Sequence, residues 1–214
     1  MVDDAASGDA ATVRRRANAL ALAVLAQLAE RPMHPYEIAR TLKDRRKDES
    51  VRLNYGSLYS VITALVRDGF IEPAGTEQDG NRPQRTVYRL TSAGRTELDD
   101  WMRALLGAPV KEYPQFMAAL SFLPLLEPDD VADLLRTRLV ALRVKVRRIE
   151  DDLEDLDDDD AADGARGETS ELAVAGSRYE LAILRAELAY TDVLARRIVD
   201  GTLGGIEAWR SAVR

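Results

Sequence analysis

Apolar residues in the first half of the chain recur at helical spacing in three short segments. Residues 12–31 are rich in Ala and Leu, and Thr12 is an acceptable N-cap for them. A second helix is expected to open at His34, with Pro35 in a first-turn position that tolerates proline. A third should follow Asn54, a good cap, because one buried stripe runs through Leu58, Ile62, Leu65 and Val66.

A hairpin and a fourth helix are expected next. Gly69 supplies a left-handed stop for the third helix, and residues 70–72 have the composition of a strand. Turn-forming residues fill positions 78–83, and residues 85–90 alternate polar and apolar. Thr91 then caps a helix that runs to residue 107. Three helices, a hairpin and a helix are the element order of a winged helix-turn-helix domain.

The second half is expected to be helical throughout. Two prolines mark a linker, a short helix covers residues 115–126, and a long helix starts at Pro128. An acidic loop at 157–168 separates it from a last helix at about 170–200. We therefore expect a mainly α protein with a winged helix-turn-helix at residues 12–106 and a coiled-coil-like helical domain at residues 107–214.

The long helix carries a narrow apolar seam with alternating spacings of four and three residues, which is typical of a coiled coil. Its members are Leu135, Leu139, Leu142, Val146, Ile149, Leu153 and Leu156. The last helix has two apolar stripes, one of which includes Ile183 and Tyr190. An antiparallel hairpin covers only one of them. We expect the seam, Ile183 and Tyr190 to serve dimerisation; an intramolecular hairpin without a partner is the alternative.

Composition argues against several functional classes. The chain has no Cys and a single His, His34, so thiolate chemistry and a His-rich metal site are not expected. Phosphate-binding, dinucleotide-binding and serine-nucleophile motifs are also missing from the sequence. We expect a protein that is not an enzyme and has no cofactor and no metal. Its acidic start and short apolar runs predict a cytoplasmic protein.

Charge is divided unevenly along the chain. Residues 1–106 hold 16 Lys and Arg against 15 Asp and Glu, whereas residues 107–214 hold 14 against 22. The second half therefore repels phosphates, and a nucleic-acid surface is expected in the first half. The polar side of the third helix offers candidate contacts to phosphates and base edges: Tyr55, Gly56, Ser57, Tyr59, Ser60 and Thr63. Arg82 and Arg85 flank the wing turn, where they can clamp a phosphate.

Several segments resemble the PadR family of transcriptional regulators. They are residues 20–38, the motif Asn54-Tyr55-Gly56-Ser57-Leu58-Tyr59, and residues 65–72 and 85–94, which together span about residues 18–106. The resemblance implies a regulator, usually a repressor, with a dimerising helical C-terminal region. It also implies DNA contacts from Tyr36, from the segment at Tyr55 to Ser60, and from the wing arginines. Asn54, directly before that segment, is a further candidate for DNA binding. Val61 departs from the pattern, since members of the family often have proline there.

These features together predict a homodimeric repressor that binds a palindromic operator on double-stranded DNA and is released by a small-molecule effector. The alternative is a winged helix that binds protein rather than DNA. Aromatic residues of both halves are candidates for a pocket that stacks on a small aromatic effector: Trp101, Phe116 and Tyr179.

Overall fold

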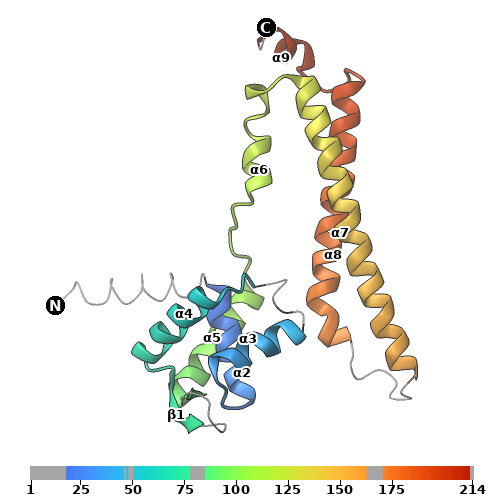
Figure 1. The fold of residues 1–214 in the computed structure, drawn as a ribbon. Helices are drawn as coiled ribbons and strands as arrows, with labels where there is room; N and C mark the ends of the chain where they lie inside the picture. Colours follow the sequence, from blue (N-terminus) through green and yellow to red (C-terminus); the bar gives the residue numbers. More distant parts are fainter. Residues whose placement is uncertain (1–17, 46, 48–50, 78–84, 163–170, 213–214) are drawn as a thin grey trace, which may run out of the picture. The chain divides into compact units, whose positions relative to one another are not determined.

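The computed structural model describes residues 18–45, 47, 51–77, 85–162 and 171–212 (Figure 1). These residues are mainly helical with one two-stranded sheet, which confirms the expected fold class. They pack as two compact units that divide between Lys111 and Glu112. The sequence placed the division after Leu106, inside the last turn of α5 (Ser92–Gly107). Helical hydrogen bonding continues through that turn, because the Ala108 amide donates to the Ala104 carbonyl.

The helices of the first unit begin at side-chain caps. Helix α2 (Ala19–Glu30) starts after Asn18, whose side chain accepts a hydrogen bond from the Leu20 amide. The expected start at Thr12 is therefore wrong for the helix as described, and Thr12 itself lies outside the described residues. Helix α3 (Pro35–Asp44) and helix α4 (Tyr55–Arg67) start where the sequence predicts. Their caps are His34 and Asn54.

The wing is an antiparallel pair of β1 (Ile71–Glu77) and β2 (Arg85–Leu90). Ile71 pairs with Leu90 at its base, and a bulge between Pro73 and Gly75 shifts the register further out. Met33 exchanges two backbone hydrogen bonds of 3.0 Å with Tyr88. This bridge joins the connection between α2 and α3 to the wing, and it was not predicted.

The core of the first unit gathers one face from each of its helices (Figure 1). Helices α2, α3 and α4 contact one another, and α5 packs on α2. The members with essentially no exposure include Val24, Leu25, Ile38, Leu58 and Trp101. Burying several large apolar side chains supplies the main stabilisation of a small domain, at about 1.5–3 kcal/mol each. The core therefore fixes α4 by its apolar face and leaves the opposite face to solvent.

The second unit is a helical hairpin with short helices at one end. It contains α6 (Gln115–Leu120), a 3₁₀ turn (Leu123–Leu125), α7 (Pro128–Ala162), α8 (Glu171–Val199) and α9 (Ile206–Ala212). The expected single helix over 115–126 is thus two short pieces, with Pro124 in the second. The acidic loop expected at 157–168 is also wrong at its start, since α7 continues through Ala162; each residue added to an existing helix gains a hydrogen bond.

Helices α7 and α8 pack along much of their length (Figure 1). Apolar side chains of both helices form two clusters between them, and ion pairs flank the clusters: Arg138 with Glu187 at 2.5 Å and Arg185 with Glu150 at 2.6 Å. Helix α9 was not predicted. It attaches through Trp209, whose indole N–H donates to the Leu126 carbonyl at 2.8 Å. In the part of the chain that is described, no helix is long and apolar enough to span a membrane.

Candidate nucleic-acid interface

Helix α4 starts at a side-chain cap that orients its first turn. Asn54 has an extended backbone, and its Oδ1 accepts a hydrogen bond of 2.7 Å from the Ser57 amide. Leu58, Ile62 and Leu65 are buried, as the stripe predicts. Val61 is also buried, and α4 runs through it without interruption, so valine at this position leaves the entry of the helix intact.

The opposite face of α4 is exposed and rich in hydroxyl groups. The candidates Tyr55, Gly56, Ser57, Tyr59, Ser60 and Thr63 all lie on it. The Ser60 hydroxyl donates to the Gly56 carbonyl and the Thr63 hydroxyl donates to the Tyr59 carbonyl, each at 2.9 Å. Each hydroxyl oxygen can still accept a hydrogen bond from a DNA base. Each hydroxyl can also donate to a base or phosphate in place of the backbone carbonyl. Tyr55 and Tyr59 are about half exposed.

The start of α3 is a capping box. His34 Nδ1 accepts from the Tyr36 amide at 3.1 Å, and a Glu37 carboxylate oxygen accepts from the His34 amide at 3.0 Å. This backbone hydrogen bond lowers the pKa of Glu37, with a further contribution from the Arg31 guanidinium, whereas partial burial opposes the shift. The box fixes the first turn of α3 and leaves the Tyr36 side chain exposed.

The end of α3 meets the start of α4 through charge. Lys43 Nζ lies 5.7 Å from the centre of the Tyr55 ring, within cation–π range. Arg40 forms an exposed ion pair with Asp44 at 3.3 Å, and Arg52 is exposed in the connection. From the sequence, a DNA-binding protein is expected to carry Arg40, Lys43 and Arg52 on the same side as the wing arginines, and this expectation stays a prediction.

The wing carries the remaining candidates. Arg85 pairs with Glu77 at the outer end of the sheet, but its side chain is outside what the structure describes, as is the whole of Arg82. Lower on the wing, Arg89 forms an ion pair with Glu72 at 2.7 Å. The roles of Arg82 and Arg85 therefore remain predictions.

The apolar seam of α7 packs within the chain. Leu135, Leu139, Val146 and Ile149 are buried in the clusters that α7 forms with α8, as the intramolecular alternative predicts. Leu142 is also buried. Leu153 packs at the edge of the same clusters, and the side chain of Leu156 is outside the described set. The interpretation of this seam as a surface for a second subunit is corrected accordingly.

Helix α8 keeps one apolar stripe exposed. Leu181, Leu184, Leu188 and Ile198 pack toward α7, whereas the other stripe does not: Leu172, Tyr179, Ile183, Tyr190 and Val193 are 48–85% exposed. Ile183 and Tyr190, both expected in dimerisation, belong to this exposed set. We call these five residues the α8 stripe.

The three aromatic residues expected to line an effector pocket are divided between the two units. Trp101 is 1% exposed in the core of the first unit. Phe116 belongs to the second unit, where the Arg138 guanidinium stacks 3.7 Å from its ring centre, and Tyr179 is 70% exposed on α8. A pocket made of all three is therefore not formed within either unit.

Sequence comparison finds a family to which most of the first unit is similar. Residues 24–100 match the transcriptional regulator PadR-like family. The match covers α2 through most of α5, including the capped α4 and the wing. This part of the chain is therefore similar to the PadR-like family.

Comparisons with individual proteins extend the similarity into the second unit. The chain is 25% identical over 137 residues to the negative transcriptional regulator PadR of Bacillus subtilis, covering 64% of this chain and 74% of that protein. The crystal structure of Bacillus subtilis PadR in complex with operator DNA superposes with a TM-score of 0.63 at 20% identity, covering 85% of this chain and 99% of that one. The complex of the same protein with p-coumaric acid gives 0.59 at 19% identity, covering 84% and 94%. At these identities the two structures establish a shared fold.

Proposed function

We propose that this PadR-like protein is a homodimeric transcriptional repressor that binds a palindromic operator and is released by a small-molecule effector. It acts in the cytoplasm, without enzymatic activity and without a cofactor. The observation that carries the proposal is the exposed hydroxyl and tyrosine face of α4, held outward by Asn54 and by the buried stripe inside a PadR-like unit. The complex of the Bacillus subtilis relative with operator DNA supports it.

Helix α4 is assigned to the major groove. Its short hydroxyls suit base edges and phosphates, and the backbone at Gly56 can approach DNA closely because it has no side chain. Tyr36 and Lys43 from α3 are assigned to phosphates beside the groove, and Arg82 and Arg85 to the phosphates next to the wing. Asn54 positions the helix by capping it, and it is also a candidate for direct DNA contact.

Dimerisation is assigned to the second unit, through the α8 stripe rather than the seam of α7. A stripe of large apolar residues along one helix favours contact with another helix of the same kind. A two-fold dimer places two α4 helices on successive major grooves, at half-sites about 34–36 Å apart. The palindromic operator follows from that symmetry.

Release by an effector is supported by the structure of the relative with p-coumaric acid. The effector class expected from the sequence is a small aromatic compound. Phe116, stacked on Arg138 beside the hairpin, is the one of the three expected aromatic residues that lies at a half-buried position in the second unit.

The decisive experiment measures binding of the full chain to labelled DNA from its own upstream region, over a range of salt concentrations. Specific retention should weaken steeply with salt, and the variants Tyr59→Ala and Arg82→Ala/Arg85→Ala should lose it. Arg103→Ala is the matched control, since that arginine is exposed on α5 and its ion pair with Asp100 is long, at 4.0 Å. Absence of sequence-specific retention on this fragment and on neighbouring promoters would instead favour the protein-binding alternative.

A further inference from the structure

A groove on the α7–α8 hairpin combines an apolar floor with a rim of arginines. It encloses about 330 Å³ and is lined by Arg136, Leu139, Val140, Arg143, Asp192, Ala195, Arg196, Val199 and Asp200. The volume lies at the small end of the range for ligand sites, about 300–1,000 Å³. Because every lining residue belongs to α7, to α8 or, for Asp200, to the turn directly after α8, the groove is complete within the second unit.

The floor and the rim have different chemistry. Leu139 and Ala195 are buried at the base of the groove, while Val140 and Val199 are about half exposed at its edges. These four side chains offer a continuous apolar surface without an aromatic ring. Such a floor can bind an aliphatic or other compact apolar group of a ligand.

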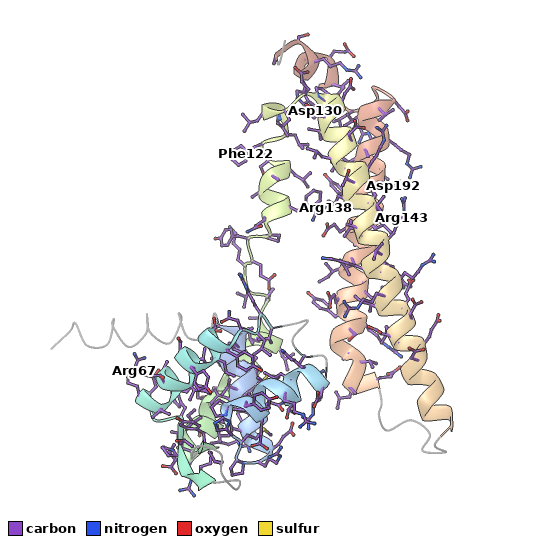
Figure 2. All side chains as sticks on the ribbon, viewed as in Figure 1. Arg67, Phe122, Asp130, Arg138, Arg143 and Asp192 are labelled. Carbon is purple, nitrogen blue, oxygen red and sulfur yellow. The ribbon has the colours of Figure 1, made fainter. Side chains whose placement is uncertain are left out.

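The rim is cationic within an acidic half of the chain. Residues 107–214 carry 14 Lys and Arg against 22 Asp and Glu, yet three arginines and two aspartates border the groove. Asp192 is engaged by Arg196 in a close ion pair, and Arg143 lies 4.0 Å from the same carboxylate (Figure 2). At that distance the ion pair between Arg143 and Asp192 contributes little stabilisation. The Arg143 guanidinium can therefore bind the two oxygens of an incoming anion.

Arg136 stands at the other end of the floor. It pairs with Asp133 one turn earlier, and more than half of its side chain is exposed. Exposed pairs of this kind contribute about 0–1 kcal/mol, so an incoming anion can compete for the guanidinium. Val140 lies between the two arginines along α7, one turn from each. The apolar floor thus lies between two arginines. This arrangement suits a small anion with an apolar group.

We propose that this groove binds a small organic carboxylate with a compact aliphatic body, with the carboxylate on Arg143 and the body on Leu139, Val140 and Ala195. The groove and the α8 stripe have no residue in common. The site does not rest on the proposed DNA binding, and its test needs no DNA.

The test is a titration of the full chain, labelled with ¹⁵N, with hexanoate, hexylammonium and acetate in turn. Hexanoate should shift the amide signals of Leu139, Val140 and Ala195 in a saturable way. Hexylammonium has the same tail and the opposite charge, and acetate has the charge without the tail, so each should shift those signals less than a third as far at the same concentration. Equal shifts with hexylammonium, or hexanoate shifts concentrated elsewhere in the chain, would overturn the proposal.

Two variants keep the test specific. Arg143→Gln should weaken hexanoate binding at least threefold, and Val140→Phe should block the floor from its exposed edge. Arg147→Gln is the matched control, because Arg147 is exposed one turn further along α7 and is outside the lining. Far-UV circular dichroism checks that each variant stays helical. Unchanged affinity in a folded Arg143→Gln protein would contradict the assignment of the carboxylate.

Discussion

Lys43 at the end of α3 holds its ammonium nitrogen 5.7 Å from the centre of the Tyr55 ring at the start of α4. The contact places a positive charge beside the first residue of the helix assigned to the major groove. An exposed cation–π contact contributes about 0.5–1 kcal/mol, which is a weak interaction. The Lys43 ammonium can therefore still attract DNA phosphates.

Replacing Lys43 with Gln should therefore weaken DNA binding by a similar factor on specific and unrelated sequences. The slope of log affinity against log salt should become shallower by about one unit, since one phosphate contact is lost. Fluorescence anisotropy at several salt concentrations measures both effects. A selective loss on the operator alone would assign Lys43 to base recognition instead.

Gly94 and Gly56 should respond oppositely to alanine. A Cβ on Gly94 would overlap the carbonyl of Phe70 and lie 2.8 Å from a Leu90 methyl. Gly94→Ala should lower the free energy of unfolding by about 3 kcal/mol, because the base of the wing must move. Thermal unfolding followed by circular dichroism measures the loss, and a wild-type midpoint would contradict the close contact.

Gly56→Ala is the opposite case. The nearest atom to a Cβ there is Asn54 Oδ1 at 3.6 Å, an ordinary contact, and alanine favours helix. This variant should be as stable as the wild type or more stable by about 0.5–1 kcal/mol, and it should bind DNA less tightly if the backbone of residue 56 approaches a phosphate. Undiminished affinity would remove Gly56 from the interface while leaving the fold unaffected.

Tyr190→Glu should convert the proposed dimer to a monomer. The substitution puts a charge in the middle of the α8 stripe, and desolvating a carboxylate in an apolar interface is costly. Sedimentation velocity at micromolar concentration should show the mass of one chain. Val144→Glu is the control, since Val144 is exposed on α7 outside the stripe and should leave the assembly unchanged. Dissociation by both variants would place the interface elsewhere on the hairpin.

Glu37 predicts a loss of stability in acid. Its pKa is lowered below the ordinary value of 4.5 by the hydrogen bond from the His34 amide. A carboxyl with a depressed pKa in the folded state stabilises the fold above pH 4.5 and loses that contribution as the pH falls through the folded value. The group is partly exposed, so the contribution is under about 1 kcal/mol.

The comparison of wild type with Glu37→Gln isolates this contribution. Glutamine keeps the acceptor without the charge, so the wild type should be more stable at pH 7, and the two proteins should converge at a pH below the lowered pKa of Glu37. Urea unfolding at both pH values measures the difference. A difference independent of pH would mean that Glu37 acts through packing alone.

Local features of the site were determined by the sequence alone. Asn54, His34 and Thr91 each cap a helix in the structure, because a cap needs only a side chain and the amides two or three residues later. The stripe through Leu58, Ile62 and Leu65 fixed which side of α4 is buried, and therefore which side faces outward. Helical periodicity is a local property, so it can be recognised in the sequence without knowledge of the fold.

Tertiary structure alone decided which surfaces meet. The seam of α7 and the two stripes of α8 are each consistent with several partners, and only the folded hairpin assigns the seam to α8 of the same chain and leaves Ile183 and Tyr190 exposed. The sequence also did not predict the bridge from Met33 to Tyr88 or the groove that contains Arg143 and Asp192. Apolar periodicity states that a face is buried, whereas the partner depends on chain geometry between residues far apart in sequence.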